Sequence, residues 1–219
     1  MSQPITASQA RSVSRRWPLI SCGTAVAAAL LLGLIVSLRR GPNEFDGEWL
    51  EEIVEHRSPL WDVPAYVMSF LGGGWFGVFL VPIGVAVLLL VLRKPWSAFY
   101  FVLASALSAG VVQLLKSLFA RARPEEMLVA ADFGSFPSGH VANAATLAVA
   151  LSILLQRRWV WVAGAVWVVL MILSRTYLGV HWLTDTFGGL LLGGAVAVLV
   201  WAPFASRLQQ EWRKAGTAP

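Results

Sequence analysis

The chain has 219 residues, of which 57% are hydrophobic and only 13% charged, and its formal net charge is +5. This balance excludes an ordinary soluble domain, in which about a quarter of the residues are charged, and it predicts an all-α, polytopic membrane protein. The net positive charge does not require a nucleic-acid partner, because the distribution of the charges along the chain explains it. The single cysteine, Cys22, excludes an intrachain disulfide and a cysteine metal cluster.

Six apolar stretches are each close to the roughly 20 residues that a helix needs to cross a bilayer. In chain order they are Trp17–Leu38, Trp75–Leu92, Trp96–Leu115, Val141–Leu155, Trp159–Leu173 and His181–Trp201. The first stretch follows basic residues, as in a signal peptide, but its length and the lack of a small-residue cleavage site favour a retained anchor. The fourth and fifth are short, so we expect them to recruit the flanking residues Ser138–His140 and Ser174–Tyr177.

The segment 41–74, between the first two spans, contains a group of acidic residues: Glu44, Asp46, Glu48, Glu51, Glu52 and Glu55. Apolar residues recur at helical spacing opposite these acids, at Phe45, Trp49, Ile53 and Val54. This pattern predicts an amphipathic interfacial helix on the outer membrane surface, with a solvated loop as the alternative. A second short helix is expected over Val63–Leu71, and the glycine run 72–74 is expected to bend the backbone after it.

The charged residues predict the topology through the positive-inside rule. With a cytoplasmic N-terminus, the inner segments carry Arg11, Arg15, Arg16, Arg93, Lys94, Arg157, Arg158, Arg207, Arg213 and Lys214. Their only acid is Glu211, so the other eleven of the twelve acids face outward. We therefore expect a multi-pass protein of the inner (plasma) membrane, with both termini cytoplasmic and the polar motifs on the periplasmic or extracellular side.

No internal repeat is apparent, so 1–219 is expected to form a single membrane domain with frayed polar tails at both ends. In the last span, Gly189 and Gly193 form a small-xxx-small pattern. Such a pattern allows the close approach of another helix, which belongs either to the same chain or to the second subunit of a homodimer.

The first polar motif is Lys116 to Pro124, with the sequence KSLFARARP. Lys116 and Arg123 are seven residues apart, nearly two helical turns, so both can hold one anion if the helix continues to Pro124. Arg121 lies well round that helix and is expected to contact lipid headgroups or the helix end. The alternative is a set of basic anchors at the membrane boundary.

The second motif, Pro137 to His140, directly precedes an apolar stretch and predicts a helix N-terminus. Ser138 can cap the helix, and Gly139 lets its backbone approach a ligand closely. The free N–H groups and the helix dipole attract an anion, and His140 would lie beside it. A capping serine with an incidental histidine is the alternative.

The third motif runs from Ser174 to Asp185. Arg175 ends the fifth span, Gly179 allows a turn, and His181 begins the sixth span. Asp185 is four residues after His181, so its carboxylate can accept the Nδ1–H of the imidazole and leave Nε2 free as a nucleophile. A structural hydrogen bond at a helix start is the alternative.

Together the three motifs read Lys116-x6-Arg123-Pro124, Pro137-Ser138-Gly139-His140 and Ser174-Arg175-x5-His181-x3-Asp185. This series resembles the complete three-part signature of the phosphatidic acid phosphatase type 2 superfamily, which also includes vanadium haloperoxidases and glucose-6-phosphatases. The signature region is 116–185, and no position departs from the pattern.

The resemblance implies a role for each matching residue. His181 would attack phosphorus to give a phosphohistidine, Asp185 would orient it, and His140 would protonate the leaving oxygen and then activate water. The phosphoryl oxygens would be held by Lys116, Arg123, Ser138, the Gly139 backbone and Arg175. Since three cations would neutralise the phosphate, we expect no metal and no cofactor.

The expected function is that of an outward-facing lipid phosphate phosphatase, whose partners are the bilayer and a membrane lipid phosphate. The resemblance suggests undecaprenyl pyrophosphate, phosphatidylglycerol phosphate or phosphatidic acid as substrates. A non-catalytic lipid phosphate binder or transporter is one alternative. A vanadate-dependent peroxidase is another, which six spans disfavour.

Overall fold

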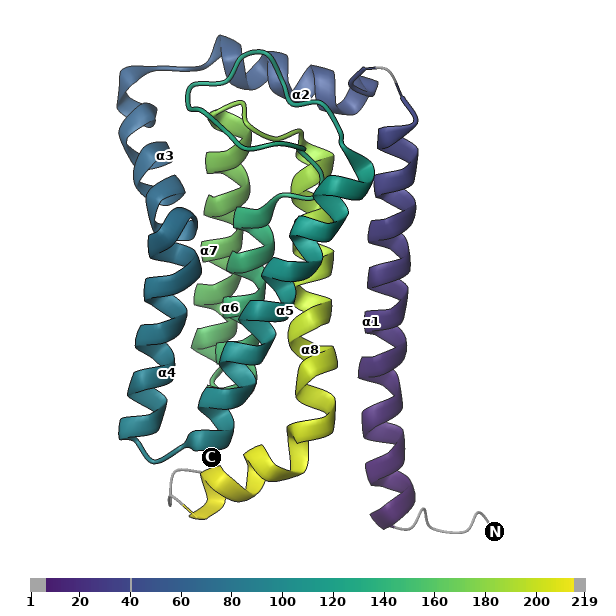
Figure 1. Ribbon diagram of the computed structural model, residues 1–219, viewed down its shortest axis with the longest axis vertical. Helices are drawn as coiled ribbons and strands as arrows, with labels where there is room; N and C mark the ends of the chain where they lie inside the picture. The colour runs from purple at the N-terminus through teal and green to yellow at the C-terminus, as the bar shows by residue number, and fades with distance from the viewer. Residues whose placement is uncertain (1–6, 40, 215–219) are drawn as a thin grey trace.

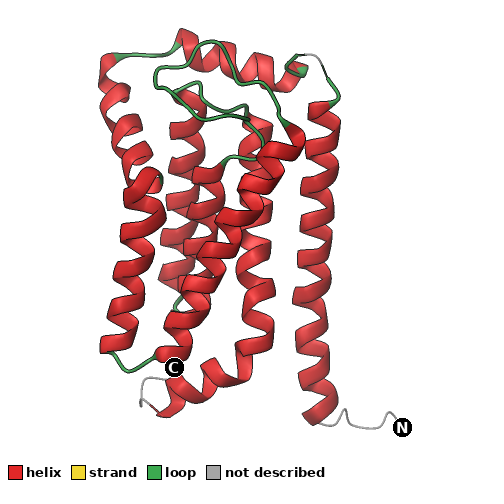
Figure 2. Ribbon diagram, in the orientation of Figure 1, coloured by secondary structure: helices red, strands yellow, loops and turns green. Residues whose placement is uncertain are grey.

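The computed structural model describes residues 7–39 and 41–214, and within them the chain is helical with no strand (Figure 2). The all-α prediction is therefore confirmed for the described residues. The tails that were expected to fray, 1–6 and 215–219, lie outside them.

The helices and their connections place both ends of the described chain at the same end of the bundle, on opposite sides of it (Figure 1). In order, the helices are α1 (Ala7–Ser37), α2 (Glu44–Glu55), α3 (Pro59–Gly72), the π-helical turn η1 (Phe76–Leu80), α4 (Val81–Val91), α5 (Pro95–Phe119), α6 (Gly139–Leu155), α7 (Arg158–Tyr177) and α8 (Leu183–Lys214). The long helices run side by side, and α2 lies across one end of the bundle (Figure 1). The start of α1 and the end of α8 lie at the opposite end from α2 (Figure 1).

Within the described residues, α1, α5, α7 and α8 are each long and apolar enough to cross a membrane. The segments Pro59–Gly72 and Phe76–Val91 pass the same test only together, and they meet at an angle of 44°. The expected helix over Val63–Leu71 is present with an earlier start at Pro59, and it ends at the glycine run as predicted. The second apolar segment is therefore longer than the predicted Trp75–Leu92, because α3 leads into η1 and α4.

The glycines of α8 allow it to pack closely on α6. A Cβ atom added to Gly189 would lie 2.5 Å from the carbonyl oxygen of Ser138, and one added to Gly193 would overlap that of Ala142. The small-xxx-small face is thus in contact with another helix of the same chain. This is the first of the two alternatives that the glycine pattern predicts. Thr146 of α6 reinforces the contact, since its hydroxyl donates to Ser108 of α5 over 2.8 Å and lies 3.1 Å from the carbonyl of Gly193.

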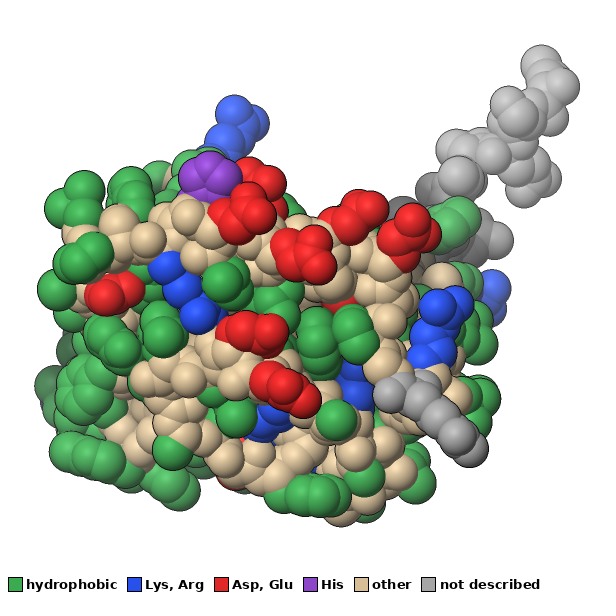
Figure 3. Space-filling view, turned by 90° about the horizontal axis from the view of Figure 1, so that it is seen from above, with side chains coloured by type: hydrophobic (Ala, Val, Ile, Leu, Met, Phe, Trp, Pro, Cys, Tyr) green, Lys and Arg blue, Asp and Glu red, His purple; other side chains and the backbone are tan. Residues whose placement is uncertain are grey.

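Helix α2 begins after Asn43, whose side chain accepts a hydrogen bond of 2.8 Å from the backbone N–H of Asp46. Most acids of α2 are exposed on this end of the bundle, where acidic side chains gather (Figure 3). Asp46 is the exception: it is fully buried beside Leu50, whereas Phe45 is exposed. The prediction that placed Asp46 with the exposed acids is wrong, because its carboxylate is paired inside the protein.

Candidate active site

The three sequence motifs meet at the α2 end of the bundle. Lys116 lies in the last turn of α5, Ser138 is the N-cap of α6, Arg175 lies in the last turn of α7, and Asp185 lies in the first turn of α8. A cavity of about 760 Å³ is lined by one or more residues of each motif: Lys116, Arg123, Gly139, His140, Arg175 and His181.

The prediction that the helix of the first motif continues to Pro124 is wrong. Helix α5 ends at Phe119, because Ala120 takes a left-handed conformation with φ of 46°. Lys116 and Arg123 nevertheless converge, since the loop that follows carries Arg123 back toward the end of α5. The Nζ of Lys116 donates to the Gly134 carbonyl over 3.0 Å, and the Nη2 of Arg123 donates to the same oxygen over 2.9 Å.

Both cations also bind Asp132, a residue that the sequence motifs do not include. Its Oδ1 accepts from Lys116 Nζ at 3.0 Å and from Arg123 Nη2 at 2.6 Å. Burial raises the pKa of Asp132, but the hydrogen bond and charge of Lys116, together with Arg123, hold that pKa below its ordinary value. A carboxylate therefore lies on two of the cations that were expected to bind phosphate.

Replacement of Asp132 by asparagine is expected to strengthen inhibition by inorganic phosphate roughly fivefold, because one competing negative charge leaves the two cations. The measurement is the inhibition constant of orthophosphate against hydrolysis of a lipid phosphate. The matched control is Glu125→Gln, which removes the same charge from an exposed position in the same loop. Weaker inhibition in Asp132→Asn would show that Asp132 holds the cations in place rather than competing with phosphate.

Arg121 does not meet lipid headgroups or the helix end, so that prediction is wrong. Its side chain is only 5% exposed and forms ion pairs with Asp46 and Asp185, at 2.8 and 2.5 Å. The side chain reaches inward because the chain leaves the helix at Ala120, one residue earlier.

The second motif forms the N-terminus of α6, as predicted, with Ser138 at the N-cap. The Ser138 hydroxyl does not cap the helix by a side-chain hydrogen bond. Among the described residues, Ser138 Oγ, Arg175 Nε and His181 Nδ1 are buried polar atoms without a hydrogen-bond partner. Because buried polar groups are normally satisfied, Ser138 Oγ and Arg175 Nε fit a site whose polar ligand completes them, whereas His181 Nδ1 faces Asp185.

His140 is positioned by α3, a segment that carries none of the motifs. The Nε2 of His140 lies 3.2 Å from the Ser69 carbonyl oxygen, and Arg175 Nη1 donates to the Ser69 hydroxyl over 2.6 Å. A Cβ atom on Gly73 would overlap the His140 ring. Sequence reasoning missed Ser69 because nothing in its surroundings distinguishes it from other small polar residues in an apolar helix.

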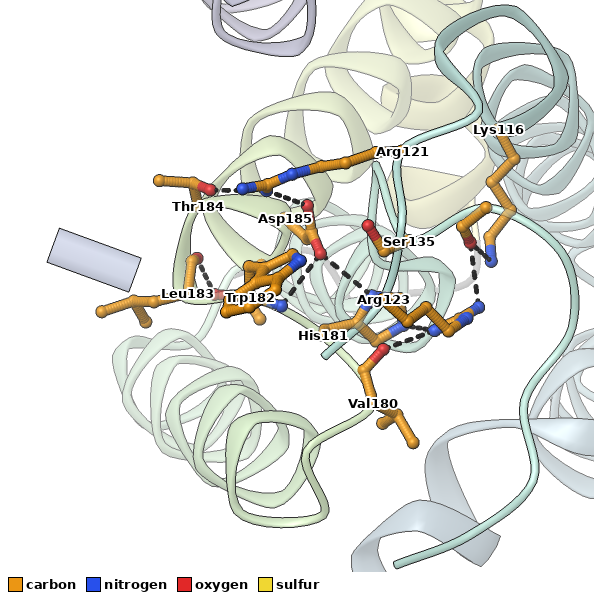
Figure 4. A network of polar contacts seen from close by, with 12 residues as sticks. Lys116, Arg121, Arg123, Ser135, Val180, His181, Trp182, Leu183, Thr184 and Asp185 are labelled. Atoms are coloured by element: carbon orange, nitrogen blue, oxygen red, sulfur yellow. Dashed lines mark hydrogen bonds and ion pairs between the residues drawn. The ribbon is translucent and has the colours of Figure 1, made fainter. Parts of the chain in front are cut away.

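His181 lies between α7 and α8, after the turn at Gly179, whose φ of 66° confirms the predicted turn (Figure 4). Its Nε2 is 3.4 Å from Arg123 Nη1, and its Nδ1 is 3.6 Å from Asp185 Oδ2. The second distance is slightly longer than a hydrogen bond. Burial, followed by the charges of Arg175, Arg123 and Lys116, lowers the pKa of His181 well below its ordinary value of 6.5. The imidazole is therefore neutral at neutral pH.

The described residues contain no group of three or more His, Cys, Asp or Glu side chains that could hold a metal ion. The positive charge in the cavity comes instead from Lys116, Arg123 and Arg175.

The fold and the site define a multi-pass helical membrane protein with histidines and cations gathered in one cavity. The pattern of the PAP2 superfamily matches residues 97–208, more than half of the chain. The chain therefore belongs to the PAP2 superfamily.

Curated relatives support this membership. The chain is 43% identical over 65 residues to the undecaprenyl-diphosphatase of Sulfolobus acidocaldarius, a match that covers 30% of this chain and 31% of that protein. It is 34% identical over 118 residues to phosphatidylglycerophosphatase B of Bacillus subtilis, covering 49% of this chain and 58% of the relative. It is also 32% identical over 157 residues to the lipid A 4'-phosphatase of Bacteroides thetaiotaomicron, covering 63% and 67%. The first two matches thus span less than two thirds of those relatives.

Two solved structures share the fold. A transmembrane PAP2-type phosphatidylglycerolphosphate phosphatase from Bacillus subtilis matches with a TM-score of 0.72 and 27% identity, over 83% of this chain and 96% of that one. The LpxE structure from Aquifex aeolicus matches with a TM-score of 0.62 and 29% identity, over 70% and 92%.

Proposed function

We propose that this protein is a lipid phosphate phosphatase, which hydrolyses a phosphomonoester or pyrophosphate of a membrane lipid. The observation that carries this proposal is the composition of the 760 Å³ cavity. One part of its wall holds the two histidines and three cations, and another part is an apolar surface from η1, α4 and α5: Val78, Phe79, Pro82, Ile83, Val102 and Ala106. An amphiphile with a phosphate headgroup matches both parts.

The proposed reaction begins with attack of His181 Nε2 on phosphorus. This breaks the bond to the lipid oxygen, which takes a proton from His140, and leaves a phosphohistidine. His140 then removes a proton from a water molecule that attacks phosphorus and releases orthophosphate and free His181. The proximity of Nε2 to Arg123 supports this assignment, since the cation that would hold a phosphoryl oxygen lies beside the attacking atom.

The positions of Lys116, Gly139 and Arg175 in the cavity wall support the proposal of further phosphate ligands. Lys116 and Arg175 would neutralise the remaining oxygens, and the unpartnered Ser138 hydroxyl and the Gly139 N–H at the α6 N-terminus would donate hydrogen bonds. Asp185 would stabilise the Nδ1–H of His181. With three cations in these roles, the proposed mechanism uses no metal ion.

The proposed topology has six crossings of the inner (plasma) membrane, with α3–α4 as the bent second crossing and α6 as the short fourth. The α4–α5 and α6–α7 connections and the last part of α8 lie at the end opposite α2, and they contain Arg93, Arg157 and Arg207 (Figure 1). Acidic residues gather on the α2 face (Figure 3). The positive-inside rule then favours cytoplasmic termini, with α2 at the outer interface and the cavity facing the periplasm or exterior. A homodimer would use a surface other than the Gly189–Gly193 face, which contacts α6.

The relatives' names suggest the substrates to assay: undecaprenyl pyrophosphate, phosphatidylglycerol phosphate and lipid A, with phosphatidic acid added from the motif resemblance. The test is phosphate release by purified protein in detergent, with and without a metal chelator. We expect release from at least one of these lipids that persists in the chelator. No release from any of them would contradict the proposal, and loss of activity that magnesium restores would contradict the three-cation mechanism.

The pH dependence of kcat/KM is expected to be bell-shaped, because His181 must be neutral while His140 carries the proton for the leaving oxygen. The lowered pKa of His181 keeps the nucleophile deprotonated as the pH falls through the ordinary histidine range. The acid limb should therefore lie below pH about 6.5. A rate that stays flat from acid to alkaline pH would contradict this assignment.

A further inference from the structure

A row of buried charged side chains runs from helix α2 to the candidate nucleophile. Asp46, Arg121 and Asp185 have side chains that are 0%, 5% and 0% exposed. Nη2 of Arg121 donates to Asp46 Oδ2 over 2.8 Å, and Nη1 donates to Asp185 Oδ1 over 2.5 Å. One guanidinium thus joins a carboxylate of α2 to a carboxylate of α8 (Figure 4 shows the Arg121–Asp185 side).

Asp46 is held rigidly by its neighbours. Its Oδ1 accepts from the Thr184 backbone N–H at 2.9 Å, and its Oδ2 accepts from the Thr184 hydroxyl at 2.7 Å and from Asn43 Nδ2 at 2.8 Å. Arg121 Nη1 also donates to the Thr184 hydroxyl over 2.8 Å. Both oxygens of Asp46 are therefore engaged, and the guanidinium that it binds is fixed in direction.

The two oxygens of Asp185 have different partners. Oδ1 accepts from Arg121, whereas Oδ2 accepts from the Trp182 backbone N–H at 2.9 Å and faces His181 Nδ1 at 3.6 Å. Rotation of this carboxylate away from the imidazole would break the Arg121 and Trp182 hydrogen bonds together. Arg121 therefore limits the orientations in which Asp185 can meet His181.

We propose that Asp46 and Arg121 are positioning residues, which hold Asp185 and through it His181 in the orientation for attack on phosphorus. This inference rests on the proposed function for the identity of the reaction. It makes α2 part of the catalytic apparatus, although α2 contributes no residue to the cavity that contains His181.

A purely structural role is a weaker explanation of these contacts. Burying two carboxylates and a guanidinium is costly, and an apolar group of similar volume would often join two helices equally well. Here the guanidinium contacts Asp185, whose carboxylate faces the imidazole of His181. The contact with Arg121 therefore restricts the orientation of the carboxylate that faces this imidazole, which an apolar contact between the two helices would not do.

The test is the titration of His181 in protein with isotope-labelled histidine, followed by NMR in detergent. The chain has only three histidines, and a His181→Ala spectrum identifies the signal. The charged or titratable groups that act on His181 are Lys116, Arg123, Asp132, His140, Arg175 and Asp185. Changing Asp46 or Arg121 leaves all of these in place.

The expected shifts of the His181 pKa have opposite signs. Arg121→Gln removes a positive charge beside Asp185, so the imidazolium is better stabilised and the pKa rises. Asp46→Asn leaves Arg121 to neutralise Asp185 alone, so the pKa falls. Simple loosening of the structure would hydrate His181 and raise the pKa in both variants, because burial is the first cause of its lowered value. A rise in both, or no change in either, would overturn the proposal.

Steady-state kinetics distinguish a positioning role of Arg121 from an effect of its positive charge alone. Arg121→Lys keeps a positive charge but cannot bridge two carboxylates in the same way, so kcat should fall about tenfold to a hundredfold with KM unchanged. The matched control for Asp46 is Glu52→Gln, which removes the same charge from an exposed position on α2 and should leave kcat and the titration unchanged. A kcat of wild-type size in Arg121→Lys would overturn the proposal.

Removal of Arg121 alone leaves two buried carboxylates without their shared cation and can unfold the protein. The double variant Asp46→Asn with Arg121→Met covers that case, because it removes one of these carboxylates together with the cation and keeps the net charge of the three side chains. Its kcat should fall by a similar factor with KM unchanged, and an unchanged kcat would overturn the proposal.

Failure of the proposed function is recognised separately. If the wild-type protein hydrolyses no lipid phosphate but the His181 titration shifts in opposite directions, the coupling stands and the reaction is wrong. If hydrolysis is present and the titration does not respond, the coupling is wrong and the reaction stands.

Discussion

Replacement of His181 by alanine is expected to lower kcat for phosphate release by at least about ten-thousandfold, because the proposed reaction loses its nucleophile. His181 is 3% exposed and packed beside Asp185, so the smaller side chain leaves the surrounding cations in place. Binding of the lipid phosphate should persist, since Lys116, Arg123 and Arg175 remain. The measurement combines phosphate release with equilibrium binding of a lipid phosphate to the same preparation.

The matched control is His56→Ala, which removes a histidine whose side chain is 72% exposed at the end of α2. Its activity should equal that of the wild-type protein. A radioactive phosphate label should be trapped on the wild-type and His56→Ala proteins during turnover, and not on His181→Ala. Substantial hydrolysis by His181→Ala would exclude the phosphohistidine route, and equal inactivity of all three proteins would favour a lipid phosphate binder.

Replacement of Gly193 by alanine is expected to destabilise the protein by about 1–3 kcal/mol, because a Cβ atom there would overlap the backbone carbonyl of Ala142. A backbone atom cannot swing aside as a flexible side chain can, so α6 and α8 would have to separate. Activity should fall as well, since the N-cap of α6 is Ser138, whose N–H donates to the Asp185 carbonyl over 3.0 Å. The measurement is thermal unfolding in detergent, followed by tryptophan fluorescence.

The neighbouring residue offers a matched control for this prediction. A Cβ atom on Gly194 would meet only Val149 Cγ2, at 3.9 Å, which is ordinary contact. Gly194→Ala should therefore unfold at the wild-type temperature or slightly above it, because alanine favours helix over glycine. Equal stability of the Gly193 and Gly194 variants would show that the close approach of α6 and α8 is not needed.

The sequence was sufficient to predict which motif residues lie together, because each motif stands at the end of an apolar helix. Helices that cross the same bilayer bring their ends to its two surfaces, so Lys116, Ser138, Arg175 and His181 are expected on one side. Their chemical roles remain proposals. The prediction that Lys116 and Arg123 share one anion came from a helix that does not exist beyond Phe119, and the loop brings them together instead.

Other parts of the site could not be predicted, because they depend on tertiary contacts. Asp46 was grouped with exposed acids since helical spacing cannot show that one acid faces a buried arginine 75 residues away. Asp132 and Ser69 belong to no motif, and their contacts with the motif cations follow from how the loop 120–138 and α3 fold over the cavity. Periodicity also failed to join α3 to α4, because the glycines and the π turn interrupt it.

The carboxylate of Asp132 also has a consequence for turnover. With this side chain on Lys116 and Arg123, the resting pocket carries its own counterion, so binding of the proposed lipid phosphate would exchange one anion for another. The same exchange in reverse would assist departure of orthophosphate, since a tethered anion is always at hand to replace it. Asp132 would thus lower the affinity of the pocket for its substrate and raise the rate at which the product dissociates.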